Sequence, residues 1–580
     1  MDNWRKTVLL WLLVITSAAT VFCVGNFDTF SNPYLINDDT RQQIFWMERW
    51  RDPQLFQNDF LALYAESYVP VGLKAIYRIG CFWFNPLLLS NILTAILFIV
   101  TAGLWFAWGR VFGDDFTAFL VVIVYFLFSG FQGQMAGGLS RGFVFPLLIA
   151  YLLFVSQGKI FHAGLILLIQ SLINPYVFLL CLLTHTLLMV TRFGPRLFPK
   201  TFQSMTNVCH VIRPSFVGAS YESDQHSSLG SRSEEKPTEK ILKTIKSLLV
   251  LNSPVILGVV FMFGNIVWYQ SSTGHLISWV EMIGKSEYTE FGRYQLYPTP
   301  SFFHELIRPW IFNLSFPYWG PVAGWIMVCL AVTVYIFAVL NYKPVLKWEG
   351  LKGLLFIIPV SLILYAIARL FLVKLFIPRR YIFYTLNIIY CISFAVALRV
   401  LFEKIRTSRV KALGLILALL AFACVKGRHV EFYDFSEHHS LYKFLQTTPK
   451  NALTAGQPEI MDNVVTFAKR PAYVTFELSH TWIEPYWSAV KKRTFDLFRA
   501  YYSSNPEEIR CFCKSNHIKY MIVRSEDFDP ERLKTSPAYF EPFNGFIWYL
   551  TNSTKYFAVL DKTIFPPIFE EKGVRVLRIE

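Results

Sequence analysis

The chain has 580 residues, of which 54% are hydrophobic, 17% aromatic and only 16% charged. Soluble domains carry about 25% charged residues, so the composition excludes an ordinary soluble protein. The formal net charge of +15 would indicate nucleic-acid binding in a soluble chain, but membrane proteins collect Lys and Arg in their cytoplasmic loops. The sequence therefore predicts a multi-pass α-helical membrane protein whose partners include membrane lipids and no nucleic acid.

Apolar runs recur along the chain, most of them near the ~20 residues that cross ~30 Å of hydrocarbon. About eleven are predicted to be transmembrane helices. They are 7–24, 84–108, 116–130, 141–157, 160–173, 176–191, 247–269, 319–341, 353–373, 381–401 and 411–425. The third and fifth runs are short, and losing both would leave the orientation of the others unchanged. Together the runs predict a transmembrane domain over residues 1–425.

Basic residues set the predicted orientation. Arg5 and Lys6 place the N-terminus in the cytoplasm. Counting spans from there puts loops 25–83 and 270–318 outside. Lys and Arg are concentrated in three segments that the same count puts inside, as the positive-inside rule demands. These segments are the linker 192–246 and the loops 342–352 and 402–410.

The first apolar run has a second interpretation. RKTVLLWLLVITSAA has the basic start, apolar run and small residues of a secretory signal peptide, although its apolar run is long for one. Loop 25–83 lies outside in either case. The expected location is an integral membrane position, in a bacterial inner membrane.

The composition changes after residue 425. LYKFLQTTPKNALTAGQPE predicts an amphipathic helix, a turn and a strand, and SSNPEEIRCFCKSN predicts a helix with Pro506 in its first turn. Three further stretches have strand patterns: RPAYVTFE, HIKYMIVR and VRVLRIE. Residues 426–580 are therefore predicted to form an α/β domain, and eleven crossings place it outside, in the periplasm.

Two adjacent carboxylates, Asp38 and Asp39, follow the first span in SNPYLINDDTRQQIFWMERW. A general base must be ionised and close to the hydroxyl that it deprotonates, and the neighbouring tryptophans would form an apolar floor at the membrane surface. The alternative is that the acids cap a helix beginning at Arg41, because carboxylates favour helix N-termini. The two interpretations are compatible, since a helix start also fixes a carboxylate in place.

Basic residues also occur at predicted external positions, against the insertion bias. Lys374, Arg379 and Arg380 precede a late span, and Arg141 follows the glycines of GQMAGGLSRGF. Guanidinium groups match phosphate oxygens with two donors each, so a phosphate at the outer headgroup level would explain them. Arg380 is preferred because Pro378 fixes the turn that presents it. The alternative is contact with ordinary lipid phosphates, or anchoring of a helix.

Loop 270–318 supplies the candidate metal ligands. Glu287, Glu290 and His304 are speculative ligands there, and His304 beside Glu305 cannot chelate alone because adjacent helical residues point about 100° apart. A lone His next to Glu is more often a surface pair. No metal site is assigned, and a divalent cation, Mg²⁺ or Mn²⁺, is left open as a cofactor.

This arrangement resembles the GT-C membrane glycosyltransferases, which include oligosaccharyltransferase, protein O-mannosyltransferases and bacterial aminoarabinose transferases. The resemblance covers the whole architecture and rests on Asp38-Asp39 in the first external loop and on Arg379-Arg380-Tyr381 before a late span. The stretch LYKFLQTTPKNALTAGQPEIMDNVVTFAKRPAYVTFE is similar to the region after the membrane in uncharacterised bacterial members. A WWDYG-like acceptor motif is missing from the sequence, so peptide glycosylation is not supported.

The resemblance implies transfer of a sugar from a polyprenyl-phosphate donor to an acceptor hydroxyl outside the cytoplasm, the acceptor being a glycan, lipid or protein. Asp39 or Asp38 would be the catalytic acid residue. Arg380, with Arg379 and Lys374, would hold the donor phosphate.

Two other functions remain open. A transporter or flippase for lipid-linked glycans would place ionisable residues in mid-span and repeat one half of the chain in the other, and neither pattern is visible. A non-catalytic scaffold would bind a partner through its tail. There, Glu477, His480 and Trp482 of FELSHTW could form a sugar-binding edge, but buried packing at a strand end is favoured.

Overall fold

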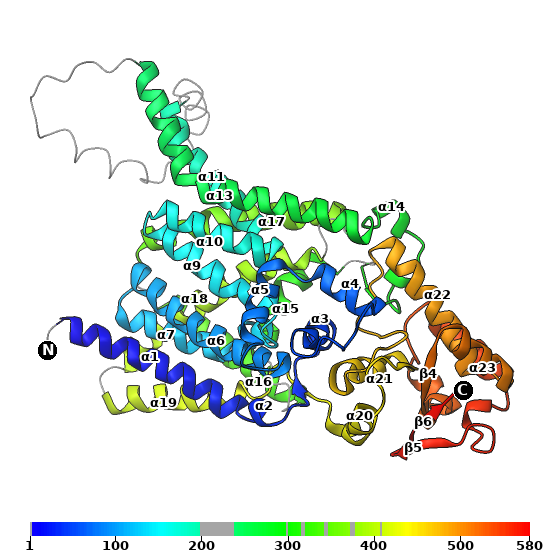
Figure 1. Cartoon of the computed structure of the whole chain (residues 1–580). Coiled ribbons are helices and arrows are strands. Elements are labelled where there is room, and N and C mark those ends of the chain that lie inside the picture. The colour runs from blue at the N-terminus through cyan, green and yellow to red at the C-terminus, as the bar shows by residue number, and fades with distance from the viewer. Residues whose placement is uncertain are drawn as a thin grey trace, which may run out of the picture.

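The computed structural model describes residues 3–197, 237–296, 300–314, 320–341, 346–371, 377–405 and 409–579. Apolar helices form a bundle in the first three quarters of the chain (Figure 1). They are α1 (Asn3–Asn26), α6 (Pro86–Phe112), α7 (Asp115–Leu127), α8 (Ser129–Met135), α9 (Val144–Ser156), α10 (Ile160–Ile173), α11 (Pro175–Leu197), α13 (Pro237–Thr273), α15 (Phe302–Leu314), α16 (Gly320–Leu340), α17 (Lys352–Phe371), α18 (Arg379–Ile405) and α19 (Arg409–Lys426).

Each apolar run that was predicted to span the membrane is helical over most of its described residues. Six helices of the described residues are long and apolar enough to cross a membrane, and a seventh span results if α7 and α8, which meet at a 66° bend, count as one. The helices of the fourth and fifth runs and the described part of the eighth are apolar but shorter. The chain is thus a helical membrane protein, while the count of eleven spans stays a prediction.

The centre of the bundle is α7. Its residues from Thr117 to Leu127 are all buried, because α7 carries charge only at its first residue and packs against α6 and α18. Asp114 caps α7 by accepting a hydrogen bond of 2.7 Å from the backbone N of Thr117. A helix that is apolar on every side is stable only when neighbouring helices surround it, so α7 forms the core of the bundle.

The loop after α1 folds into short elements. They are α2 (Asp28–Ser31), β1 (Leu35–Ile36), α3 (Thr40–Gln43), the 3-10 helix Phe45–Trp50, α4 (Phe60–Tyr68) and α5 (Val71–Gly80). Strand β1 pairs antiparallel with β2 (Tyr433–Asp434), which follows the last helix of the bundle. Trp46 is fully buried in a core that this loop shares with the C-terminal part of the chain. The prediction that the tryptophans form a floor at the membrane surface is therefore wrong for Trp46.

The C-terminal part contains a four-stranded sheet in the order β3-β4-β6-β5, in which β3 and β4 are parallel and the other neighbours antiparallel. The strands are β3 (Leu453–Gly456), β4 (Ile518–Arg524), β5 (Pro567–Glu571) and β6 (Val574–Arg578). The helices are α20 (His439–Gln446), α21 (Pro458–Asn463), α22 (Glu484–Tyr501), α23 (Pro506–Ser515), α24 (Pro530–Thr535) and α25 (Phe543–Ser553). The expected sheet domain is present, with α20, α23, β3, β4 and β6 where the sequence predicts them.

One predicted strand is wrong. In RPAYVTFE only Ala472 pairs in strand fashion, as an isolated bridge to Thr454. The following backbone finds other partners, since the N–H of Phe476 donates to the carbonyl of Pro458 and that of Glu477 to the side chain of Asp462. Backbone groups that are satisfied in this way need no strand ladder. The segment therefore leaves the sheet, and Glu477 near its end contacts Gln42 of the first loop.

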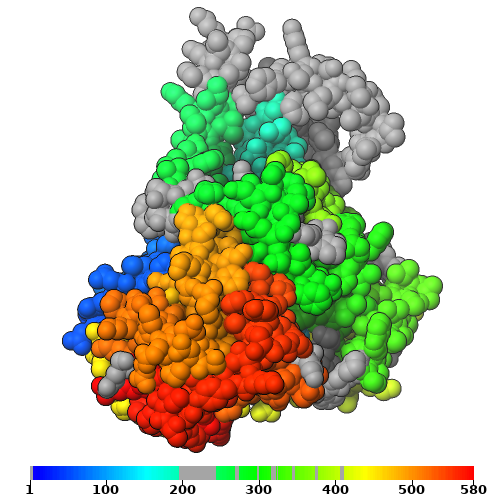
Figure 2. Space-filling view, turned by 90° about the vertical axis from the view of Figure 1, so that its right-hand side faces the viewer, coloured from blue at the N-terminus to red at the C-terminus, as the bar shows by residue number. Residues whose placement is uncertain are grey.

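The C-terminal part lies at one end of the bundle, with α3 and α4 of the first loop between the two (Figure 1). Seen from that end, it is drawn in orange and red and adjoins the green segment around α14 (Trp279–Met282) (Figure 2). Isolated bridges from Leu276 to Ile483 and from Gly292 to Glu541 join that segment to the C-terminal part. Two loops that were both predicted to be external thus meet the C-terminal domain at the same end of the bundle.

Candidate functional site

Asp39 lies at the beginning of α3 and forms an ion pair with Arg141, in the 3-10 turn before α9. Nη2 of Arg141 also donates a hydrogen bond of 2.9 Å to Oδ1 of Asn37. Gly137 lets the two segments approach, because its φ is +87° and a Cβ there would lie 2.7 Å from Oγ1 of Thr40. The glycine-rich stretch before Arg141 therefore serves to bring this arginine against the first loop.

The two adjacent acids have different partners. Asp38 accepts a hydrogen bond of 3.1 Å from Nε of Arg41, and its side chain is 44% exposed. Asp39 occupies the N-cap position of α3, but its side chain makes no capping hydrogen bond. Instead, Oδ1 of Asp39 accepts a hydrogen bond of 2.8 Å from Nε2 of Gln42. The capping interpretation is therefore wrong for Asp39, whose carboxylate is held by side chains.

Arg379 and Arg380, which were predicted to bind phosphate, are the first residues of α18. Arg380 interacts electrostatically with Asp39. Tyr384, one turn further along α18, interacts electrostatically with Arg380, Arg141 and Arg379. Three guanidinium groups from two distant parts of the sequence thus lie within electrostatic reach of one tyrosine, and Arg380 also lies within reach of the carboxylate of Asp39.

Two of these arginines have further contacts. The guanidinium of Arg380 lies 5.0 Å from the ring centroid of Tyr176, in the first turn of α11. Nε of Arg379 lies 4.0 Å from Oε2 of Glu305. Lys374, the third residue of this predicted basic group, lies outside the described residues.

A buried carboxyl from the C-terminal part adjoins the same site. Oε2 of Glu477 accepts hydrogen bonds of 3.2 Å from Nε2 of Gln42 and from Nη2 of Arg293. The guanidinium of Arg293 also stacks on Phe476, 4.0 Å from the ring centroid. Burial raises the pKa of Glu477 to about 7, although Arg293 opposes the shift. Glu477 therefore holds its proton to a higher pH than an exposed glutamate does.

Asp462, at the end of α21, is a second buried acid beside Glu477. Its Oδ1 accepts a hydrogen bond of 3.0 Å from the backbone N of Glu477, and its Oδ2 has no hydrogen-bond partner among the described residues. Burial raises the pKa of Asp462 well above the usual range, against the opposing effect of Arg41. A buried acid without full compensation is stabilised by binding a proton, so burial favours the protonated form of Asp462.

Two half-buried tyrosines, Tyr68 and Tyr294, connect these groups. Burial raises the pKa of both Tyr68 and Tyr294, and each also interacts electrostatically with Asp39 and Glu477. Tyr294 interacts with Arg380 as well. Both phenols therefore stay protonated and can donate hydrogen bonds. Their position makes the Asp39 group and the Glu477 group parts of one site.

The suggested metal ligands do not gather at this site. Oε1 of Glu287 accepts hydrogen bonds of 2.6 Å from Lys491 and 3.2 Å from Trp487, so this residue holds its loop against α22. Glu290 and His304 are exposed. In the described ranges, no three His, Cys, Asp or Glu side chains are arranged so as to hold a metal ion.

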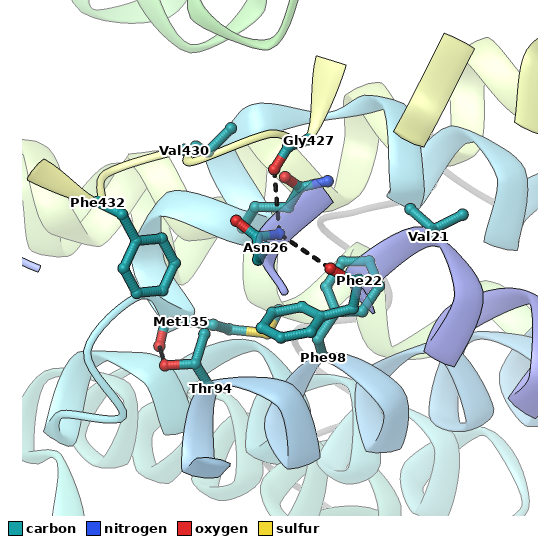
Figure 3. A pocket seen from close by; sticks show the side chains of 10 residues that line it. Val21, Phe22, Asn26, Thr94, Phe98, Met135, Gly427, Val430 and Phe432 are labelled. Carbon is teal, nitrogen blue, oxygen red and sulfur yellow. Dashed lines mark hydrogen bonds between the residues drawn. The ribbon is translucent and has the colours of Figure 1, made fainter. Parts of the chain in front are cut away.

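A small cavity lies apart from these charges, between α1, α6, α8 and the segment after α19 (Figure 3). The side-chain amide of Asn26 spans it and donates hydrogen bonds to the carbonyls of Phe22 at 3.3 Å and Gly427 at 3.2 Å. Its walls are formed by Val21, Phe22, Asn26, Thr94, Phe98, Gln132, Met135, Gly427, Val430 and Phe432. A pocket with no charged lining offers nothing to hold a phosphate, so the charged site is the better candidate.

No protein-family model and no curated protein matches the chain. The solved structures that are similar to it include the following three. The oligosaccharyltransferase of Archaeoglobus fulgidus in complex with Zn and sulfate is 11% identical to this chain, with a TM-score of 0.43. The match covers 92% of this chain and 70% of the oligosaccharyltransferase chain. The oligosaccharyltransferase AglB from the same organism, in complex with an inhibitory peptide and a dolichol-phosphate, is 10% identical, with a TM-score of 0.44. The match covers 92% of this chain and 71% of the AglB chain. ArnT from Cupriavidus metallidurans is 11% identical, with a TM-score of 0.39. The match covers 100% of this chain and 99% of the ArnT chain.

Oligosaccharyltransferase is one of the GT-C enzymes that the sequence pattern resembles. At these identities and scores the likenesses assign no activity and no residue role.

Sequence reasoning missed several members of the site. Gln42 stands in no motif, and Arg293 is only one of several charged residues in loop 270–318. The link of each residue to Glu477 is a contact between distant parts of the sequence. Glu477 and His480 were noticed in FELSHTW, and their burial is confirmed at 6% and 4% exposure. The expected strand end is absent there. The buried side chains of Glu477 and His480 instead hydrogen-bond to Gln42, which in turn hydrogen-bonds to Asp39. The sequence signal was an acid and a histidine within an apolar, aromatic stretch.

Proposed function

We propose that this protein is a membrane glycosyltransferase that moves a sugar from a polyprenyl-phosphate donor to an acceptor hydroxyl on the non-cytoplasmic side. The supporting observation is the ion pair of Asp39 with Arg141, together with the electrostatic interaction of Asp39 with Arg380. Arg379 and Arg380 also interact electrostatically with Tyr384. A carboxylate beside several guanidinium groups is what transfer from a lipid phosphate needs: a proton acceptor and a cradle for the leaving phosphate.

The chemistry requires one base and neutralisation of charge. Asp39 takes the proton of the acceptor hydroxyl while the hydroxyl oxygen forms a bond to the anomeric carbon of the sugar. The bond between that carbon and the lipid phosphate breaks, and its electron pair leaves with the phosphate oxygen. Arg380 and Arg379 offset the negative charge that develops there, which lowers the barrier because the charge is met by donors already in place.

Arg141 has two roles in this proposal: it pairs with Asp39, and it binds the donor phosphate. It neutralises Asp39 in the present structure, and its buried Nε has no hydrogen-bond partner among the described residues. An unpartnered buried N–H costs about 1–3 kcal/mol, and a donor phosphate oxygen would satisfy it. When the donor phosphate draws Arg141 toward itself, the hold on Asp39 weakens and the carboxylate becomes a stronger base. Arg141 would thus couple donor binding to activation of the acceptor.

The test compares Asp39→Asn with Asp38→Asn in membranes supplied with labelled polyprenyl-phosphate sugars. Positioned general bases contribute roughly 10²–10⁴-fold to rates, so we expect Asp39→Asn to lose transfer by such a factor. Asp38→Asn should keep most of it, because Asp38 is partly exposed and paired with Arg41. Full transfer by Asp39→Asn would exclude the catalytic role. Movement of the labelled lipid across the membrane without transfer would favour the flippase alternative.

A further inference from the structure

The side-chain amide of Gln42 lies at the junction of the first loop and the C-terminal part. Its Nε2 is 2.8 Å from Oδ1 of Asp39 and 3.2 Å from Oε2 of Glu477. Its Oε1 is 2.9 Å from Nε2 of His480. On the far side of the imidazole, Nδ1 of His480 is 2.9 Å from the hydroxyl of Tyr64. Gln42, His480 and Tyr64 are each at least nine-tenths buried.

The chemistry of these groups fixes where the protons are. Two carboxyl groups face one end of the Gln42 amide, so that end is the NH₂ donor and the other end, toward His480, is the oxygen. An amide oxygen only accepts, so Nε2 of His480 carries the proton. Nδ1 is then the acceptor, and the Tyr64 hydroxyl donates to it. Burial lowers the pKa of His480 well below its ordinary value, which keeps the ring neutral with this one proton.

We propose that Gln42 is a positioning residue for Asp39. His480 and Tyr64, the next two members of the hydrogen-bonded chain, set the orientation of the Gln42 amide. The inference rests on the proposed function, in which Asp39 is the base. Arg141 holds Oδ2 of Asp39 and Gln42 holds Oδ1, so the plane of the carboxylate is fixed from two sides. The C-terminal domain thereby acts on the membrane site without contacting the substrate.

The packing around His480 explains why the imidazole can do this. Its ring stacks on Trp482 at a centroid distance of 4.3 Å and is edge-on to Tyr64 and Tyr68 at 5.5 Å and 5.1 Å. Aromatic neighbours on several sides prevent the ring from turning over, so Nε2 keeps facing Gln42. The hydroxyl of Tyr68 also donates to the backbone carbonyl of Gln42 at 3.1 Å, which holds the start of the side chain.

The first experiment reads the proton position directly. Nitrogen NMR of the detergent-solubilised, histidine-labelled protein distinguishes a protonated from an unprotonated ring nitrogen, and His480→Gln identifies the signals by their loss. We expect Nε2 of His480 to be protonated and Nδ1 to be an acceptor, and Gln42→Leu to shift both signals. A proton on Nδ1 would place the amide oxygen toward the carboxyls and overturn the inference, whether or not the protein transfers sugar.

The second experiment measures transfer in a matched series. His480→Phe keeps the ring but removes both hydrogen bonds, whereas His480→Gln keeps a donor for Oε1 of Gln42. A small misplacement of a catalytic group costs up to about 100-fold in rate, so we expect His480→Phe and Gln42→Leu each to lower kcat by roughly 10-fold to 100-fold. The KM for the donor should stay within about twofold, and His480→Gln should recover most of the rate.

Combining the two changes separates positioning from general destabilisation. Residues that act through one hydrogen-bonded chain give non-additive effects, so Gln42→Leu with His480→Phe should be little slower than either alone. Additive losses, or losses in KM only, would overturn the positioning role. If Asp39→Asn transfers sugar normally while the NMR result holds, the proposed function is wrong and the orientation of Gln42 by His480 still stands.

Discussion

The carboxylate of Asp39 and the guanidinium of Arg141 form an ion pair that joins the first loop to the turn before α9. The side chain of Asp39 is 30% exposed and that of Arg141 is 22% exposed, so the pair is partly buried and still accessible to solvent. Asn37 shares the same guanidinium. Asn37, Asp39 and Arg141 thus connect the N-terminal loop to the helix bundle.

Arg141→Lys should separate geometry from charge at this pair. Lysine keeps the positive charge but cannot donate to Asp39 and Asn37 in the fixed fork of a guanidinium. We expect kcat for sugar transfer to fall by about 10-fold to 100-fold. Arg141→Lys and Arg380→Lys should each also raise the KM for the donor, because both guanidinium groups are proposed to contact its phosphate. Steady-state transfer rates check both, and Arg78→Lys, on an exposed position of α5, is the matched control that should change neither.

The buried ion pair of Arg293 with Glu477 should be important for stability. The two side chains are 13% and 8% exposed, and removing one partner of a buried pair costs about 3–5 kcal/mol. We expect Arg293→Met to lower the Tm in detergent, and the double variant with Glu477→Gln to recover most of the loss because no unpaired charge remains. Arg499→Met, at a 61% exposed side chain, serves as the control. Equal Tm values for all variants would contradict the pair's role.

Stability should also depend on pH through Glu477. Burial raises its pKa from 4.5 to about 7 in the folded protein. The folded state therefore binds a proton that the unfolded chain releases between these two values, and the free energy of unfolding should fall as pH rises through that window. Denaturant unfolding at about pH 5 and about pH 8 measures this. Glu477→Gln should flatten the dependence, and an unchanged slope in that variant would assign the effect to Asp462.

Accessibility to a membrane-impermeant thiol reagent should confirm the orientation. Three exposed positions, Gln57, Lys514 and Lys404, can be changed singly to Cys in a cysteine-free background. We expect Gln57→Cys and Lys514→Cys to react from the non-cytoplasmic side, because both lie on the side of the C-terminal domain, and Lys404→Cys to react only from the cytoplasm. Labelling of the first two from opposite sides would contradict the proposed site.

Much of the fold was predictable because it depends on local patterns. Apolar runs of span length identify the helices of the bundle, and strand periodicity locates β4 and β6. The strand predicted over RPAYVTFE failed because its apolar alternation reflects burial alone. The side chain of Asp462 takes the backbone hydrogen bond of Glu477, and no local pattern reveals such a competitor.

The sequence by itself determined that this chain is a helical membrane protein with a C-terminal sheet domain, since hydrophobicity and charge act residue by residue along the chain. It also singled out Asp39, Arg141, Arg379 and Arg380. Only the tertiary structure decided that Asp39 pairs with Arg141 while Asp38 pairs with Arg41, and that Gln42, Arg293 and Glu477 belong to the same site as Asp39. Hydrogen bonds and ion pairs act over a few ångströms in space, and segments hundreds of residues apart come that close only when the whole chain has folded.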